Sequence, residues 1–305
     1  MKVVVTGSEG FVGKELANAL IRRSHQVERF DVKLGHNILD KGAVEKAVTG
    51  ADAVYHLAAQ LDEGAKDLFE VNVQGTKNVL EACEKARVKQ LIYLSTVGVM
   101  GKLKHGQCAD ENTPINPETN YEKSKADAEK AAQEYLESIP LTIVRAAFVI
   151  GPSGFWTGII KQAKHNFPLV GEGKNKWQVI YYRDLADALV FLLGKEDAMG
   201  EIFIIAEDKG VTLRELYIAL RKELGVTEGL KTISPLMAKA VSWIYFTGAT
   251  ITHKKTVVMP AHIDRLERER CYSTKKINAL GWHAKTSTMQ AVAETVKALE
   301  GKDKK

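Results

Sequence analysis

Apolar residues in the first half of the chain alternate between two periodicities, which predicts buried strands separated by amphipathic helices. Residues 2–6 form a β-branched run that is apolar on both faces, as expected for a strand inside a parallel sheet. A helical pattern follows, with Leu16 and Leu20 on one side and charged residues on the other. The next predicted strand, residues 26–30, ends at Asp31.

The alternation continues to about residue 150. We expect a short edge strand at 35–40 and a weak helix to residue 48. Further strands are expected at 53–59, 90–95 and 141–145, and helices at 66–87 and 121–137. Strands that alternate with helices predict an α/β fold with a doubly wound parallel sheet. Residues 1–150 are therefore expected to form the sheet domain. Residues 151–305 are expected to form a smaller, mostly helical region that returns to the sheet in places, for example at the predicted strand 201–205.

A glycine-rich turn lies between the first strand and the first helix. Gly7 permits a tight turn, Gly10 permits close approach of the backbone to a pyrophosphate, and Gly13 permits packing of the helix on the sheet. The helix N-terminus offers free N–H groups to phosphates, and Asp31 stands at the end of the next strand. This context predicts a dinucleotide-binding domain at 1–150 and a substrate-binding region at 151–305.

Two further segments are expected at the same edge of the sheet. Thr96 ends a strand, and Tyr121 and Lys125 open a helix one turn apart, so that they share a face. A lysine ammonium one turn away, with a positively charged nicotinamide nearby, lowers the pKa of the phenol, which suits the phenol to acid/base catalysis. The same spacing recurs at Tyr272 and Lys276, but there it follows a charged helix, remote from any strand end.

Composition narrows the class of protein. The 305 residues are 45% apolar and 27% charged with a net charge of +5, which is ordinary for a globular protein. Part of that charge lies in residues 302–305, which we expect to be a solvated tail rather than a nucleic-acid arm. The three cysteines are too few and too scattered for a disulfide framework or a metal site. The first strand begins at residue 2, which leaves no room for a signal peptide, and we expect a cytosolic protein.

These motifs resemble the extended short-chain dehydrogenase/reductase family, the NAD-dependent epimerase/dehydratase superfamily. The matching segments are Val5–Gly13, His56–Ala59, Asn72–Thr76, Ser95–Thr96 with Gly101, Tyr121–Lys125, Arg145 with Gly151–Pro152, and Tyr182–Ala186. The resemblance implies a Rossmann-like fold and an enzyme that uses NAD.

The resemblance also implies roles for individual residues. Tyr121 would be the general acid/base, Lys125 would hold the nicotinamide ribose, and Thr96 would bind the substrate oxygen. Asp31 would accept hydrogen bonds from the adenosine ribose, which favours NAD over NADP; Arg29 and Lys33 nearby moderate that preference. The other implied cofactor contacts are Gly7, Gly10, Phe11, Val12, Gly13, Asn37, Ile38, Leu57, Ala58, Ala59 and Asn72.

The substrate class is inferred from departures from the pattern of nucleotide-sugar enzymes. Phe148 and Trp177 stand where many of those enzymes have asparagine and arginine. We therefore expect oxidation or reduction of a secondary alcohol or ketone on a largely apolar substrate, as in 3β-hydroxysteroid dehydrogenase-like and dihydroflavonol reductase-like members. The alternative is a nucleotide-sugar 4-epimerase or dehydratase, and core packing of the two aromatic residues is equally compatible with the sequence.

Two predictions concern surfaces. Relatives of this family pair the helices that correspond to 66–87 and 121–137, so a homodimer is expected. The segment 234–251 contains Trp243, Ile244, Tyr245 and Phe246 but is too short and too interrupted by Lys239 to span a membrane. We expect it to pack in the core or in a dimer contact; an interfacial helix or a lid over an apolar pocket is the alternative.

Overall fold

A parallel sheet of six strands forms the centre of the computed structural model, which describes residues 1–251 and 260–301. The strand order is β10-β5-β4-β3-β1-β2, and every pairing is parallel. The strands are β1 (Lys2–Thr6), β2 (Gln26–Phe30), β3 (Ala53–His56), β4 (Gln90–Thr96), β5 (Leu141–Ala146) and β10 (Ile202–Ile205). The predicted doubly wound, Rossmann-like sheet is confirmed.

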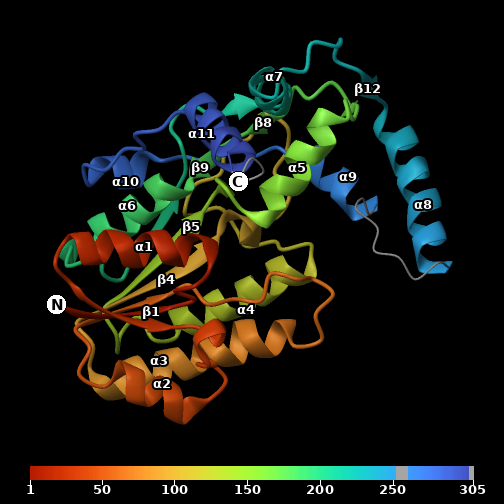
Figure 1. Cartoon of the computed structure of the whole chain (residues 1–305). Helices are drawn as coiled ribbons and strands as arrows, with labels where there is room; N and C mark the ends of the chain where they lie inside the picture. Colours follow the sequence, from red (N-terminus) through yellow and green to blue (C-terminus); the bar gives the residue numbers. More distant parts are fainter. Residues whose placement is uncertain (252–259, 302–305) are drawn as a thin grey trace.

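Helices cover both faces of the sheet (Figure 1). One face carries α1 (Phe11–Arg22) and α6 (Tyr182–Leu192), and the other carries α2 (Lys41–Val48), α3 (Gly75–Ala86) and α4 (Asn120–Gln133). Each layer buries its own apolar cluster, because the strands are apolar on both sides. The carboxyl ends of β1, β2 and β4, which carry the glycine turn, Asp31 and Thr96, therefore meet at one edge of the sheet.

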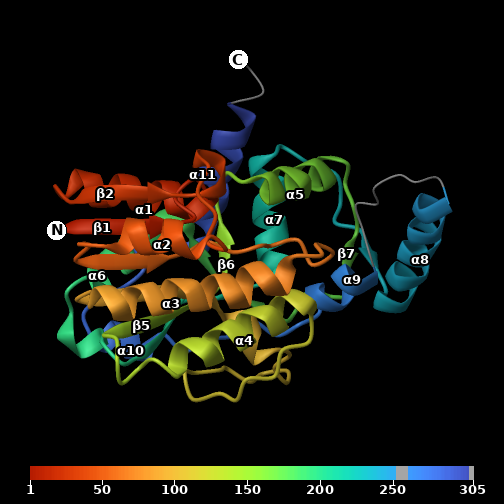
Figure 2. The same cartoon turned by 90° about the horizontal axis from the view of Figure 1, so that it is seen from below.

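The second half of the chain lies beyond that edge, apart from α6, β10 and the segments that pack with them (Figures 1 and 2). Its helices are α5 (Gly154–Lys164), α7 (Leu213–Glu223), α8 (Pro235–Ile251), α9 (Pro260–Leu266), α10 (Lys275–Ala279) and α11 (Thr288–Glu300). Its small sheets pair β6 (Phe148–Ile150) with β9 (Val179–Tyr181), β7 (Leu169–Val170) with β12 (Thr232–Ile233), and β8 (Lys176–Trp177) with β11 (Val211–Thr212). Although β10 returns to the main sheet, the division at residue 150 stays a prediction.

Three local predictions were wrong. Residues 35–40 form no strand; Asp40 instead caps α2 by accepting a hydrogen bond from the Ala43 amide. The strand predicted at 53–59 ends at residue 56, where the chain leaves the sheet edge. The helix predicted at 66–87 starts with a π-helical turn at residues 70–74 before α3. Such turns often occur at functional sites, and periodicity does not reveal them.

The structure pairs two of the three cysteines. Cys108, in the segment between β4 and α4, forms a disulfide with Cys271, while Cys83 is free and buried. The pair joins positions 163 residues apart, and the spacing of three cysteines along the sequence does not indicate it. Disulfides are uncommon in cytosolic proteins, so this pairing counts against the cytosolic location, which stays a prediction. Within the described part of the chain, no helix is long and apolar enough to cross a membrane.

Helix α8 packs on the rest of the chain by one side only. Ala238 is buried with Val170 and Ile263, whereas the large apolar side chains at positions 236, 237, 241, 243 and 244 are exposed. The expectation that segment 234–251 packs in the core is therefore wrong for the outward side of residues 236–244. The side chains of Tyr245 and Phe246 lie outside the described residues.

Candidate functional site

The glycine turn between β1 and α1 leaves no space for a side chain at two of its three glycines. A Cβ on Gly7, whose φ is +70°, would lie 2.7 Å from the Ala58 nitrogen, and one on Gly13 would lie 2.0 Å from the Gly7 oxygen. Gly10 caps α1 without a side-chain hydrogen bond, and the first helical bond runs from the Lys14 amide to the Gly10 carbonyl. The amides of the first turn therefore point out of the helix, as a pyrophosphate site requires.

Asp31 is held at the mouth of this turn. Its two carboxylate oxygens accept hydrogen bonds from the Glu9 and Lys33 amides, each at 2.9 Å, and each oxygen keeps a lone pair for a ribose hydroxyl. Both nearby cations are engaged by Glu9: Arg29 donates to its carboxylate at 3.0 Å, and Lys33 donates to its carbonyl at 3.3 Å. The engagement of these cations disfavours a 2′-phosphate beside Asp31, so the local geometry fits NAD.

The remaining predicted cofactor residues line or support the same edge. Phe11 stacks on Tyr182 with ring centroids 5.0 Å apart, and Val12 packs against the core. Asn37 is exposed at the surface, whereas Ile38 is buried against Gly75, where a Cβ would lie 2.4 Å from it. The residues that follow β3 without regular structure are half-buried: Leu57, Ala58 and Ala59.

A buried chain of polar side chains links β1 to α3. Thr6 Oγ1 lies 2.8 Å from His56 Nδ1, and His56 Nε2 lies 2.9 Å from Thr76 Oγ1. The Thr76 hydroxyl donates its only proton to the Asn72 carbonyl at 2.6 Å, so it must accept from His56 Nε2, which assigns a neutral imidazole protonated there. Burial lowers the pKa of His56 to about 3. His56 is therefore a neutral structural link and not an acid/base group.

Asn72, in the π-helical turn, continues this chain to α4. Its side-chain amide donates to Ser124 Oγ at 2.9 Å and to the Gln60 carbonyl at 3.0 Å. Ser124 in turn donates to the Tyr121 carbonyl at 2.8 Å. Asn72 therefore fixes the first turn of α4 relative to the strand that carries the glycine turn, a role that the sequence does not reveal.

The three predicted catalytic residues come from β4 and α4. Thr96 ends β4, and its hydroxyl accepts a hydrogen bond from the Gly98 amide at 3.1 Å. Tyr121 lies in the first turn of α4, and Lys125 lies one turn later on the same face. The Lys125 ammonium donates to the Leu94 carbonyl at 2.8 Å, which ties α4 to the end of β4 beside Thr96.

Burial shifts the pKa values of Tyr121 and Lys125 in opposite directions. Burial, with smaller contributions from Glu122 and Glu63, raises the pKa of Tyr121 to about 12. Burial also lowers the pKa of Lys125 to about 7, against the opposing effect of Glu129. Proximity to lysine alone therefore does not make Tyr121 a phenolate at neutral pH. Further positive charge is needed, and an oxidised nicotinamide would carry it.

A buried ion pair lies beneath this pair, one helical turn beyond Lys125. Glu129 accepts from the Arg145 guanidinium at 2.6 Å and from the Ser95 hydroxyl at 2.6 Å. The Glu129 and Arg145 side chains are 0% and 3% exposed, respectively. Arg145 was noted in the sequence only as a family marker, and its partner was missed because strand and helix contacts cannot be read from one sequence.

The predicted substrate residues belong to an aromatic cluster. The Phe148 ring centroid lies 5.4 Å from that of Phe155, 5.8 Å from that of Trp156 and 6.2 Å from that of Trp177. Trp177 and Trp156 are buried, whereas Phe148 is partly exposed and Phe155 is exposed. The structure thus brings Phe148 and Trp177 together, and part of the Phe148 side chain stays exposed to solvent.

Arg270, which the sequence analysis missed, lies on this cluster. Its guanidinium carbon is 4.5 Å from the Trp177 ring centroid and 5.8 Å from that of Phe148. Its Nε is buried without a hydrogen-bond partner, and burial lowers its pKa. Among the described residues it forms no carboxylate ion pair, whereas Arg268 pairs with Glu118 and Glu122. Arg270 thus brings a cation without a carboxylate partner to the aromatic cluster.

In the second Tyr-x-x-x-Lys match, the tyrosine and the lysine do not lie on the same helix. Tyr272 precedes α10, whereas Lys276 lies within it and pairs with Glu201 at 2.5 Å. Tyr272 is nevertheless closer to the site than expected, because it pairs with Ala109 and lies near Arg270. The two side chains do not form a helical pair like that of α4.

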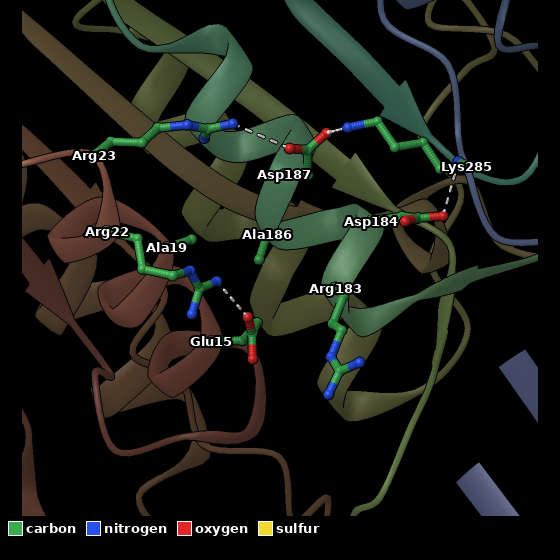
Figure 3. A pocket seen from close by; sticks show the side chains of 9 residues that line it. All are labelled: Glu15, Ala19, Arg22, Arg23, Arg183, Asp184, Ala186, Asp187 and Lys285. Carbon is green, nitrogen blue, oxygen red and sulfur yellow. Dashed lines mark hydrogen bonds and ion pairs between the residues drawn. The ribbon is translucent and has the colours of Figure 1, made fainter. Parts of the chain in front are cut away.

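A charged hollow on the surface between α1 and α6 lies away from these residues (Figure 3). Arg23 and Lys285 both bind Asp187, and Arg22 binds Glu15. No predicted cofactor or catalytic residue lines the hollow. Because most of its charged side chains pair with one another, we assign it to helix packing.

Comparisons with known proteins agree with this geometry. A model described as the NAD dependent epimerase/dehydratase family matches residues 3–206. An N-acetyl-alpha-D-glucosaminyl-diphospho-ditrans,octacis-undecaprenol 4-epimerase of Escherichia coli O157:H7 is 26% identical over 96% of this chain and 94% of its own length. A 3-beta-hydroxysteroid dehydrogenase of Mycolicibacterium neoaurum is 26% identical over 96% of this chain and 90% of its own length. A Thermus thermophilus UDP-glucose 4-epimerase solved with NAD is 24% identical, with a TM-score of 0.77 over 99% of each chain.

Proposed function

We propose that this chain, which belongs to the NAD dependent epimerase/dehydratase family, transfers hydride between NAD and a secondary alcohol or ketone on a largely apolar substrate. The main support is the placement of Tyr121 and Lys125 on one face of α4. The Lys125 ammonium donates to the carbonyl of Leu94, two residues before Thr96. The glycine turn and Asp31 at the same sheet edge support NAD as the cofactor.

In the proposed oxidation, the substrate hydroxyl is held by Thr96 and Tyr121. When bound, NAD supplies the hydride acceptor. The Tyr121 phenolate takes the hydroxyl proton as the carbon–oxygen double bond forms, and the reverse reaction returns that proton. Thr96 keeps the oxygen in place by a hydrogen bond, and Lys125 binds ribose hydroxyls and stabilises the phenolate when charged. The raised pKa of Tyr121 makes this step depend on positive charge brought close to the ring.

Asp31→Ala is expected to shift cofactor choice from NAD towards NADP. The substitution removes a carboxylate that accepts from ribose and repels a 2′-phosphate, while Arg29 and Lys33 remain. A lost hydrogen bond to a charged group costs about 1.5–3 kcal/mol, or roughly 10- to 100-fold in NADH affinity. Fluorescence titrations with NADH and NADPH give the ratio of dissociation constants. A ratio that stays unchanged, whether both affinities are retained or both fall equally, would contradict the assignment of Asp31 to cofactor choice.

The apolar substrate class is supported by the exposed side of the aromatic cluster. Phe148 and Phe155 offer ring surface there, and large aromatic surfaces contribute strongly to binding of apolar groups. The similarity to a 3-beta-hydroxysteroid dehydrogenase over most of both chains supports the same class.

Arg270 favours a second candidate, a sugar-diphosphate epimerase or dehydratase that uses the same Thr96, Tyr121 and Lys125. Its guanidinium, which has no carboxylate partner among the described residues, could pair with the negative charge of a diphosphate bound on the aromatic cluster. The relative from Escherichia coli, whose name contains both a diphosphate and an undecaprenol, supports this candidate and shows that a charged and an apolar part can occur in one substrate of a relative.

A thermal-shift screen of the NAD-loaded protein separates the two candidates. Sterols and other hydroxy-lipids form one arm, UDP- and dTDP-sugars form the other, and Arg270→Gln serves as the matched variant. A ligand at 100 times its dissociation constant stabilises the protein by about 2.7 kcal/mol. We expect stabilisation by the apolar arm, retained in Arg270→Gln. Stabilisation by nucleotide sugars alone, lost in Arg270→Gln, would overturn the apolar choice and leave the catalytic residues intact.

We also propose a homodimer formed through α3 and α4. The two helices pack side by side on one face of the sheet (Figure 2), and pairing them with a second copy would build a four-helix contact. Light scattering that gives the mass of one chain at micromolar concentration would contradict the proposal.

A further inference from the structure

Two consecutive residues of β4 contact the Lys125 ammonium. The ammonium nitrogen lies 4.3 Å from the centroid of the Tyr93 ring, and it donates to the carbonyl of Leu94 at 2.8 Å. Lys125 is 3% exposed and Tyr93 is 1% exposed, so the contact is shielded from water. A cation over the face of an aromatic ring is attracted by the negative charge of that face, and most strongly where both groups are desolvated. The sequence analysis did not single out Tyr93.

The part of Tyr93 that serves Lys125 is its ring. The Tyr93 hydroxyl is buried and forms no hydrogen bond among the described residues. The Thr76 hydroxyl lies close enough to influence the pKa of Tyr93, but it already donates to the Asn72 carbonyl and accepts from His56. The Tyr93 ring also stacks on the His56 imidazole, with centroids 5.5 Å apart. A phenylalanine at position 93 would therefore offer Lys125 the same face.

The buried carboxylates of α4 do not pair with Lys125. Glu129, one turn further along the helix, favours the charged form of Lys125 but is itself paired with Arg145. Glu122, in the first turn, is bound by Arg268. Among the described residues Lys125 forms no ion pair, so its contacts with β4 are the closest ones that favour the charge.

The other titratable groups around Lys125 are neutral at neutral pH. Burial lowers the pKa of His56, on β3, to about 3, and burial raises the pKa of Tyr121, on α4, to about 12. The buried residues of the π-helical turn, of α3 and of segment 97–100 include no charged side chain. Since burial lowers the pKa of Lys125 to about 7, any contact that favours the ammonium changes its population at neutral pH.

The hydrogen-bond donors of the ammonium show what this arrangement achieves. An ammonium has three N–H groups, of which one donates to the Leu94 carbonyl and another is directed at the ring. We propose that Tyr93 is a positioning residue, whose ring face stabilises the Lys125 ammonium and holds it with one N–H free for the nicotinamide ribose. The role towards the ribose rests on the proposed function, whereas the contact between Tyr93 and Lys125 does not.

Nitrogen-15 NMR of the lysine side chains measures the pKa of Lys125 in the full chain, without cofactor or substrate. The signal is identified by its loss in Lys125→Met, and it should titrate near 7, apart from exposed lysines, which ionise near about 10.4. Tyr93→Phe keeps the ring and is expected to leave this pKa unchanged. A trifluorinated phenylalanine at the same position withdraws electrons from the ring face, and Tyr93→Leu removes the ring. Both are expected to lower the pKa by about 1 unit.

The matched control is a second lysine that lies over a ring. Lys195 is 4.6 Å from the centroid of the Phe191 ring, and Phe191→Leu should leave the pKa of Lys125 unchanged. A pKa that is unchanged or raised with the trifluorinated ring overturns the proposal, and this comparison also decides if Tyr93→Leu does not fold. An equal fall in Tyr93→Phe would assign the effect to the hydroxyl and overturn it as well. The expected pKa shifts together with a fully active Tyr121→Phe would instead overturn the proposed function and leave the contact with Tyr93 standing.

Discussion

Replacing Tyr121 by phenylalanine is expected to lower turnover by about 10²–10⁴-fold while cofactor binding is retained. The ring stays in the first turn of α4, but the proton that passes to and from the substrate oxygen is removed. The measurement is the steady-state kcat with the substrate that the thermal-shift screen identifies, together with the NADH dissociation constant of the same variant. A loss of kcat without a loss of NADH affinity separates acid/base catalysis from damage to the fold.

Tyr272→Phe is the matched control for this prediction. Tyr272 also stands four residues before a lysine and is buried, but Lys276 is held by Glu201 and does not face it on a helix. Its kcat is expected to stay within a few-fold of the unaltered chain. Equal losses in the two variants would show that the acid/base assignment to Tyr121 is wrong.

Arg145→Met is expected to lower the free energy of unfolding by about 3–5 kcal/mol. The substitution leaves the Glu129 carboxylate buried without a cation, with neutral donors only: the Ser95 hydroxyl at 2.6 Å and the Gln133 amide at 3.5 Å. An uncompensated buried charge is costly, whereas removal of both charges is much less so. The double variant Arg145→Met/Glu129→Gln should therefore recover part of the loss. Urea unfolding of the three proteins measures these differences.

A surface pair provides the control for this second prediction. Arg22 pairs with Glu15 at 2.9 Å, but the Arg22 side chain is 63% exposed. Exposed pairs contribute about 0–1 kcal/mol, so Arg22→Met should change stability by less than that. If Arg145→Met behaved like Arg22→Met, the ion pair would not hold α4 against β5.

The fold was largely predictable because its signals are local. The β-branched run before Gly7, the helical spacing after Gly13 and the acid at the end of β2 each reflect steric or burial constraints on neighbouring residues. Thr212 caps α7 through a capping box with Glu215, which is a local signal of the same kind. The π-helical turn at 70–74 was missed, because it is defined by its backbone hydrogen bonds, which apolar spacing does not report.

The candidate site was predictable only where its residues are close in sequence. The spacing of Tyr121 and Lys125 is a property of one helix, and so it could be recognised. The partners of Glu129 and Asn72, the pairing of Cys108 with Cys271, and the approach of Arg270 to Trp177 all join distant segments. The opposite shifts in pKa of Tyr121 and Lys125 were also unforeseen, because burial depends on the packing around them.

The most direct test of the proposed site is the ionisation of Tyr121 with and without NAD⁺, which requires no substrate. Ultraviolet difference absorbance measures phenolate as pH rises towards about 10, where an unperturbed tyrosine ionises. NAD⁺ should produce one additional phenolate at lower pH in the unaltered chain and in Tyr272→Phe, but none in Tyr121→Phe, because positive charge beside the ring opposes the raised pKa of Tyr121. Bound NAD⁺ without a new phenolate, or the same signal in Tyr121→Phe, would contradict the placement of the nicotinamide at Tyr121 and Lys125.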